Sequence, residues 1–281
     1  MSAASPDAPV IVGQPVQLSE RVRRLTCPNP GMMTGPGTNT YLVGDRDVAV
    51  IDPGPEHDAH LNAIVEASAG DIRWIIATHT HGDHSPNAAR LAERTGAEVV
   101  GYSAKDGFVP TRTAGDGDVV AGAGFTLRAV HTPGHASNHL CWLLEEENLL
   151  FSGDHVMSGS TVVITPPDGD MAEYLASLAR VKAMGVAGIA PGHGAFIADP
   201  DAVLSQYIEH RSAREAAIAS ALSAMSEGSI EEIVSRVYVD VPEALHPVAR
   251  YSVWAHLRKL VSEGAVATTD RDDIKARWSI T

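Results

Sequence analysis

The fold of this sequence is decided by the stretch Thr78-His79-Thr80-His81-Gly82-Asp83-His84-Ser85. It places three imidazoles and one carboxylate between positions 79 and 84. Histidine is the commonest metal ligand, and imidazole combined with carboxylate suits a divalent transition metal. A lone histidine is usually no more than a satisfied polar residue, but four donors at this spacing indicate a metal site.

The residues on either side of this stretch favour convergence of the donors. The short apolar run 74–77 is typical of a strand buried on both faces. His79 and His81 are two positions apart at its exit, so they should point the same way. Pro86 is favoured at the first position of a helix, which we expect at 87–94. One pair of donors would therefore reach the metal from the strand end and the other from the helix start.

Length and composition place the chain among ordinary globular proteins. Its 281 residues, 44% hydrophobic and 20% charged, fit one large domain or one domain with a small appendage. The formal charge of -14 disfavours attraction to a polyanion and suits a neutral or cationic partner, although acidity often serves solubility alone. Cys27 and Cys141 are too few and too isolated for a disulfide scaffold or a thiolate metal cluster.

The N-terminal residues carry no targeting signal that we recognise. Residues 1–13 lack a basic region followed by an apolar core, and no later run is long enough to span a bilayer. We therefore expect a cytoplasmic protein with no membrane partner.

The first 200 or so residues alternate between strand and helix patterns, which indicates an α/β layered domain. The expected helices lie at 57–67, 87–94 and 171–184, and His57 and His60 are expected to face solvent on the first of them. The expected strands lie at 22–26, 40–43, 48–51, 74–77, 97–102, 125–130, 140–144, 149–152 and 186–190.

The pattern changes near residue 200. Helices expected at 201–226, 229–238 and 245–262, followed by a hairpin, have the order of a winged-helix module, with Trp254 and Leu257 in its core. We accordingly predict a catalytic domain at 1–210 and a winged-helix-like domain at 211–281. From Ser212 onward the chain has eight basic and ten acidic residues, a net charge of -2. Duplex binding depends on a basic face, so duplex DNA is disfavoured as a partner.

Three further candidate ligands each stand at the end of an expected strand. His135 follows a Pro-Gly turn, Asp154 follows the strand 149–152, and His193 follows the last core strand. Singly, each could be a turn residue. Together with the first stretch they supply five histidines and two aspartates at one edge of a sheet, where α/β folds place their sites.

With these residues in place, the chain resembles the metallo-β-lactamase fold superfamily. The resemblance implies an αββα sandwich and two Zn²⁺ ions per chain. By resemblance, His79, His81 and His135 hold the first zinc, and Asp83, His84 and His193 hold the second. Asp154 bridges the two, and Asp83 and Asp154 are the expected catalytic residues. The segment 33–41 and the winged-helix tail are similar to the β-lactamase-like protein 2 group. Some members of that group are single-stranded RNA endonucleases, and some fungal relatives cleave acyl-carrier-protein thioesters.

Such a site predicts a hydrolase in which two divalent ions acidify a shared water and stabilise the negative charge that develops on the oxygen of the substrate. Our first hypothesis is hydrolysis of a small-molecule ester or thioester, and the second is cleavage of single-stranded RNA. A mono-iron persulfide dioxygenase, a β-lactamase and a nucleic-acid-binding protein with a vestigial domain are weaker alternatives. Asp52 is either a supporting partner of the metal ligands or a turn former. His139 and His155 either donate a proton to the leaving group, donate a hydrogen bond to a metal ligand, or serve ordinary packing. The sequence leaves substrate-binding residues unknown and homodimer formation open.

Overall fold

The computed structural model describes residues 8–68 and 71–281 and divides the chain into two compact units. The first unit consists of the described residues up to Thr132 together with Asn138–Thr161 and Met184–Asp201. The second consists of Pro133–Ser137, Val162–Ala183 and Ala202–Thr281. The parts of the predicted first domain at 1–7 and 69–70 lie outside the described residues, and the domain boundary after residue 210 stays a prediction.

The first sheet brings the ends of its central strands to one edge. Its strands run in the order β1 to β7, antiparallel from β1 to β4 and parallel from β4 to β7. The register pairs Ile51 of β4 with Ile76 of β5, and Ile76 with Val100 of β6, so these strands end side by side. The strands are β1 (Pro15–Gln17), β2 (Val22–Thr26), β3 (Asn39–Val43), β4 (Val48–Ile51), β5 (Ile72–Ile76), β6 (Glu98–Gly101) and β7 (Arg112–Thr113).

The second sheet likewise gathers two strand ends. Its order is β12-β11-β10-β9-β8, and only the pair β11 and β12 is parallel within it. Because parallel strands end at the same edge, Asp154 and His193 leave the sheet together. The strands are β8 (Val119–Gly122), β9 (Phe125–His131), β10 (Leu140–Leu144), β11 (Leu149–Gly153) and β12 (Gly188–Pro191).

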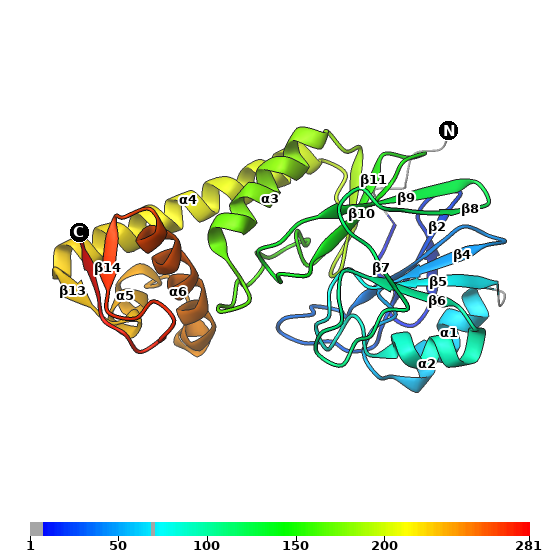
Figure 1. Cartoon of the computed structure of the whole chain (residues 1–281), viewed down its shortest axis with the longest axis horizontal. Helices are drawn as coiled ribbons and strands as arrows, with labels where there is room; N and C mark the ends of the chain where they lie inside the picture. The colour runs from blue at the N-terminus through cyan, green and yellow to red at the C-terminus, as the bar shows by residue number, and fades with distance from the viewer. Residues whose placement is uncertain (1–7, 69–70) are drawn as a thin grey trace. The chain divides into compact units, whose positions relative to one another are not determined.

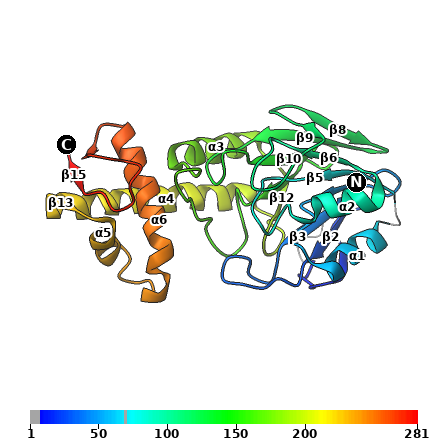
Figure 2. The ribbon, with the colours of Figure 1, turned by 60° about the horizontal axis from the view of Figure 1, so that its bottom comes forward.

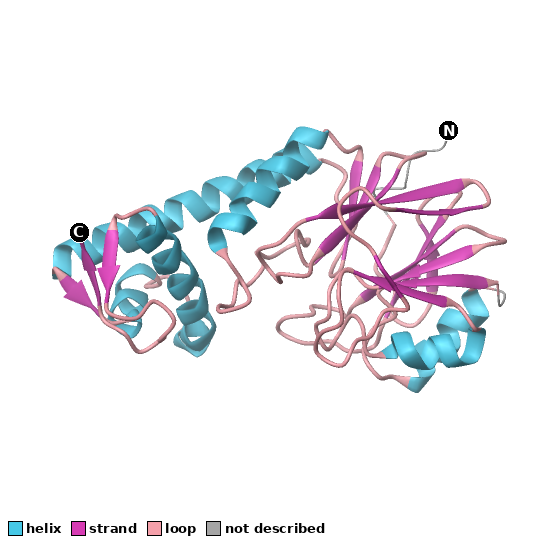
Figure 3. Cartoon of the chain, in the orientation of Figure 1, coloured by secondary structure: helices cyan, strands magenta, loops and turns pink. Residues whose placement is uncertain are grey.

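The two sheets pack face to face, as the two strand layers in Figure 3 show. Tyr41 of the first sheet and Phe151 of the second meet in this core, with ring centroids 5.1 Å apart. The helices α1 (Asp58–Ala67) and α2 (Asn87–Thr95) cover the outer face of the first sheet, where Leu61 and Leu91 pack on its apolar residues (Figure 1). Aliphatic side chains on both faces of β4 and β5 explain why these strands read as continuous apolar runs.

The second unit contains most of α3 (Met171–Met184) and α4 (Pro200–Met225) and ends in a small three-stranded sheet of order β13-β15-β14 (Figure 2). Its core includes Trp254 and Leu257, as predicted, together with Trp278. The elements after α4 are β13 (Glu227–Gly228), α5 (Ile230–Val237), the 3₁₀ turn η1 (Glu243–Leu245), α6 (His246–Ser262), β14 (Val266–Thr268) and β15 (Trp278–Ile280).

The predicted α/β class, a sandwich of two sheets followed by a C-terminal module of helices and a small sheet, is confirmed. Among residues 8–68 and 71–281, no helix combines the length and the hydrophobicity that crossing a membrane requires.

Candidate metal centre

The first two histidines follow the end of β5, which is held against the second sheet. The Thr78 carbonyl accepts a hydrogen bond from the Leu140 backbone N–H at 2.7 Å, which ties this strand end to the second sheet. His79 is buried, and its Nε2 lies 3.0 Å from Nδ1 of half-buried His81. Two imidazole nitrogens facing each other this closely suit shared coordination of one ion.

Asp52, at the end of β4, holds this strand end and the next ligand in place. Its carboxylate accepts hydrogen bonds from the Thr78 backbone N–H at 2.7 Å and from the Thr78 hydroxyl at 2.8 Å. The same carboxylate lies 2.9 Å from Nδ1 of His84. A carboxylate bonded to one ring nitrogen directs the other toward a metal, so Asp52 is a supporting residue rather than a mere turn former.

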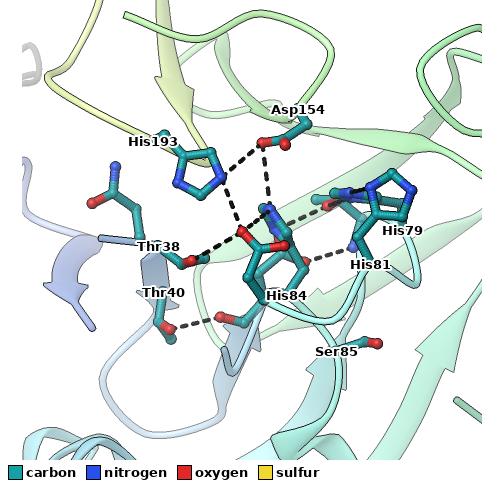
Figure 4. Close-up of polar contacts among 12 residues, drawn as sticks. Thr38, Thr40, His79, His81, His84, Ser85, Asp154 and His193 are labelled. Atoms are coloured by element: carbon teal, nitrogen blue, oxygen red, sulfur yellow. Dashed lines mark hydrogen bonds and ion pairs between the residues drawn. The ribbon is translucent and has the colours of Figure 1, made fainter. Parts of the chain in front are cut away.

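Four predicted ligands converge from three different elements, and Figure 4 shows His84 and His193 directed toward Asp154. Nε2 of His84 lies 3.4 Å from Oδ1 of Asp154, and Nε2 of His193 lies 3.3 Å from the same oxygen. On the other side, Oδ2 of Asp83 lies 3.5 Å from His84 Nε2 and 3.2 Å from His193 Nε2. The sequence thus brings residues 83 and 193 together because β5 and β12 end at the same edge of the sandwich.

Close backbone approach makes room for these ligands. A Cβ on Gly192 would lie 2.8 Å from Oδ1 of Asp154 and 2.8 Å from Cε1 of His84. Gly153 has a positive φ of 47°, and a Cβ there would lie 2.5 Å from the Thr78 hydroxyl. Both positions therefore require glycine, for space and, at Gly153, also for conformation.

The charges of the cluster shift its pKa values in opposite directions. Burial alone would lower the pKa of His84, but the carboxylates around it outweigh burial and raise it well above its usual value. In the same way the pKa of His193 rises to about 9, chiefly through Asp154. Burial alone would raise the pKa of Asp83, yet His84 and His193 lower it to about 2. His79 differs, because burial and its neighbouring imidazoles lower its pKa well below the usual value.

The donor set fits divalent metal ions. Ligand atoms of His79, His84 and Asp154 lie within 4.8 Å of one another, and so do those of Asp83, His84 and His193. Nε2 of His84 is fully buried and has no hydrogen-bond partner within residues 8–68 and 71–281, although two carboxylates flank it. A buried donor atom facing carboxylates in this way is what a metal ligand presents before the ion binds.

His135 falls in the segment Pro133–Ser137, which belongs to the second unit. There its Nδ1 lies 2.8 Å from the carbonyl oxygen of Val163. Its place in the first metal site therefore stays a prediction.

Sequence reasoning missed several residues that support the site. The loop before β3 contributes Thr38, whose hydroxyl lies 3.3 Å from Oδ2 of Asp83, and Gly37, whose carbonyl lies 3.3 Å from Nδ1 of His193. These contacts join positions far apart in sequence, so no local pattern indicates them. The prediction that His60 faces solvent was wrong: it is buried, and its Nε2 lies 2.8 Å from the hydroxyl of Thr40 on β3.

The two further histidines are buried near the site. His139 has its ring centroid 5.1 Å from that of His79, and its Nδ1 lies 2.9 Å from the Thr132 hydroxyl. His155 is also fully buried, with its ring 6.2 Å from that of His139. Burial fits both a packing role and a supporting role, so the part that these two residues play stays a prediction.

Comparison with protein families gives two matches. The model described as "Metallo-beta-lactamase superfamily" matches residues 33–193, and the "Beta-lactamase associated winged helix domain" matches residues 229–278. "Lactamase-like protein vrtG" of Penicillium aethiopicum is 34% identical over 93% of this chain and 88% of its own length. "Beta-lactamase-like protein 2 homolog" of Caenorhabditis elegans is 32% identical over 90% of this chain and 88% of its own length.

Solved structures share the fold. A "Beta-lactamase domain protein from Burkholderia ambifaria" is similar with a TM-score of 0.84 at 21% identity, covering 99% of this chain and 97% of that one. ETHE1 from Myxococcus xanthus is similar with a TM-score of 0.55 at 23% identity, covering 84% of this chain and 99% of that one.

Proposed function

This chain belongs to the metallo-beta-lactamase superfamily, and from that premise we propose that it is a dinuclear-zinc hydrolase acting on a small-molecule ester or thioester. The observation that carries the proposal is the convergence of Asp83, His84, Asp154 and His193. When bound, two zinc ions supply an acidified water and an electrostatic partner for a developing oxyanion.

Each ion would be held by its own set of residues, with one residue shared. We assign His79, His81 and His135 to the first ion, Asp83, His84 and His193 to the second, and Asp154 to both. The assignment of His135 is supported by the anchoring of its loop, because Asn138 at the loop's end donates a hydrogen bond at 3.0 Å to the hydroxyl of Thr80. The carboxylates of Asp83 and Asp154 offset part of the charge of the ions, and the imidazoles stay neutral when they ligate.

The charge distribution supports an acyl substrate over RNA. The winged helix pairs many of its cations with its own acids, so they offer little unpaired charge to phosphates. These pairs are Arg250 with Glu231, Arg258 with Asp272, Lys259 with Glu215 and Glu263, and Arg277 with Glu227 and Glu232. Nucleic-acid affinity comes largely from basic groups that displace counterions, and the net charge of -14 opposes it.

The loop before β3, which contacts Asp83 and His193, also favours an acyl substrate over RNA. Met32 and Met33 at its tip are 70% and 51% exposed, while Thr38 at its base contacts Asp83. Exposed thioether side chains adapt to apolar groups of varied shape. An acyl chain is a better match to such a surface than a phosphodiester backbone.

The proposal is tested by activity on a panel of acyl thioesters and esters and on a labelled unstructured RNA. We expect thioester or ester hydrolysis that is lost with chelator, restored by zinc and reduced at least 1,000-fold in Asp154→Ala, on the order expected for loss of a catalytic group. His57→Ala is the matched control, because this residue only caps α1. RNA cleavage lost in Asp154→Ala without thioester or ester hydrolysis would overturn the proposal in favour of the endonuclease.

Metal analysis supplies an independent check. Two zinc ions per chain are expected, whereas one iron per chain would favour a dioxygenase. We further propose a cytoplasmic location, which is supported by two buried cysteines that form no disulfide with each other.

A further inference from the structure

We propose that Thr38 is a positioning residue for the second metal ion, and that its hydroxyl orients the Asp83 carboxylate toward that ion. The inference rests on the proposed metal site but is independent of the substrate. It gives a structural role to part of the segment 33–41, which supplies no metal ligand itself.

The direction of the hydrogen bonds around Thr38 is fixed by its neighbour Asn29. The Thr38 backbone N–H donates to Oδ1 of Asn29 at 2.9 Å, and a backbone N–H can only donate. The amide orientation of Asn29 follows, so its Nδ2 donates to the Thr38 hydroxyl oxygen at 3.0 Å. The hydroxyl hydrogen of Thr38 is left for Oδ2 of Asp83 at 3.3 Å, and an ionised carboxylate can only accept.

This arrangement restricts the rotation of the most exposed of the second-site ligands. Asp83 follows Gly82 in the turn between β5 and α2 and is more exposed than the other second-site ligands. Thr38 is fully buried, so its hydroxyl has little freedom. A fixed donor on one carboxylate oxygen orients the group for binding an ion, as partners of metal ligands generally do.

The same short segment also holds His193, another ligand of this site. Residues Thr38 and His193 pair as an antiparallel bridge, and the Gly37 carbonyl lies 3.3 Å from Nδ1 of His193. Asn39 fixes the turn around His193 by donating from Nδ2 to the carbonyls of Pro191 and Gly194, both at 2.9 Å. The segment 37–39 therefore contacts both Asp83 and the turn that carries His193.

Geometry at Gly37 keeps this segment close to β2. Its φ is 143°, and a Cβ there would lie 1.9 Å from the carbonyl oxygen of Cys27. Only glycine fits, so the approach of Thr38 to Asp83 is set by the backbone. A substitution can therefore remove the Thr38 hydroxyl without moving the chain.

The test compares Thr38→Val, which keeps the shape and removes the hydroxyl, with Thr38→Ser, which keeps the hydroxyl. In the full chain, zinc affinity at each site is measured by competition with a chromophoric chelator, together with zinc content and thermal unfolding of the metal-free protein. We expect Thr38→Val to bind the first ion as the wild type does and the second roughly 10- to 100-fold more weakly. The affinity of Thr38→Ser for the second ion should stay within about twofold of the wild-type value, because the hydroxyl that orients Asp83 is kept.

Thr34→Val is the matched control, because its hydroxyl donates to the Asn29 carbonyl within the same loop and contacts no ligand. It should leave both affinities unchanged. Thr38→Ala makes the same test if the valine methyl beside the carboxylate prevents folding. Equal zinc binding by Thr38→Val and the wild type, or equal weakening in Thr38→Ser, would overturn the inference. A wild type that binds fewer than two ions would instead overturn the proposed function.

Discussion

Among single residues, Asp52 supports the metal site without being a ligand itself, because its carboxylate holds both His84 and the end of β5. Its φ of 51° is a left-handed conformation that a non-glycine residue rarely adopts, and its carboxylate is 2% exposed. The fold maintains this strained position because Asp52 bonds both Thr78 and His84. The strained backbone of Asp52 is therefore kept because its carboxylate orients His84.

Asp52→Ala should weaken zinc binding roughly 10- to 100-fold and also lower stability, because it leaves the Thr78 N–H and a histidine nitrogen without their buried partner. Chelator competition measures the first effect and denaturant unfolding the second. Asp58→Ala serves as the control, since this aspartate is on the surface of α1. Wild-type zinc affinity in Asp52→Ala would show that His84 does not depend on this carboxylate.

Two glycines of the site make a second residue-scale prediction. In Gly192→Ala the new methyl would lie 2.8 Å from both Asp154 and His84, so we expect weaker zinc binding by tenfold or more and a loss of about 1–3 kcal/mol of stability. Gly82→Ala lies within the central stretch but meets nothing within 4 Å, and it should change stability by less than about 0.5 kcal/mol. Zinc titration and thermal unfolding of the two variants, measured side by side, compare their zinc affinities and stabilities. Equal behaviour of the two would refute the steric argument.

For whole elements, agreement between sequence and structure follows the strength of the hydrophobic pattern. The strand at 140–144 and the helix at 171–184 have the predicted bounds because a continuous apolar run in the first and helical spacing of apolar residues in the second leave little ambiguity. The strands β1, β7, β8 and β13 were not predicted, since they have two to four residues and pair at sheet edges or ends. Pairing of that kind is decided by the partner strand rather than by local preference.

In the candidate site, too, the features with a local sequence pattern were predicted and the contacts between distant residues were not. Alternation of His79 and His81, and their position after a buried strand, were visible in the sequence. The contact of His60 with Thr40, and that of Thr38 with Asp83, join residues 20 and 45 positions apart. Helical periodicity places a residue on a face but does not reveal which strand covers that face.

In the winged helix, a partly buried polar cluster between α4 and α6 predicts a pH dependence. The carboxylate of Glu215 lies 3.0 Å from Nδ1 of buried His256 and 2.7 Å from Nζ of Lys259. Burial lowers the pKa of His256 below its ordinary 6.5 despite Glu215. Burial would raise the pKa of Glu215, but His256 and Lys259 outweigh it and lower that pKa below 4.5.

Both folded-state pKa values are depressed, so the unfolded state binds more protons and the winged helix should lose stability as the pH falls below about 6.5, and further below about 4.5. Hydrogen exchange of α6 amides, corrected for the intrinsic effect of pH, measures this loss. Glu215→Gln should remove the part of the loss that appears at the lower pH. Glu231→Gln, in an exposed pair with Arg250, should not. Constant α6 protection from pH 7 to pH 4 would contradict the prediction.

On the scale of the whole molecule, the two units have separate cores. The sandwich buries its apolar residues in clusters made of both sheets and of α1 and α2. The winged helix has its own core around Trp278. Every proposed ligand of the second ion lies in the first unit, so stabilisation by that ion should not extend evenly over the chain.

Metal removal tests this separation. Zinc bound at a free concentration 100 times its dissociation constant should stabilise the sandwich by about 2.7 kcal/mol, because only the folded unit brings residues 83, 84, 154 and 193 together. Calorimetry of the full chain, with chelator and then with zinc, should therefore show one unfolding transition that moves to higher temperature and a winged-helix transition that moves less. Magnesium at the same concentration should move neither, since it prefers oxygen ligands to imidazole. Asp154→Ala should suppress the zinc shift, and an undiminished shift in that variant would mean that the ion stabilises the chain from another place.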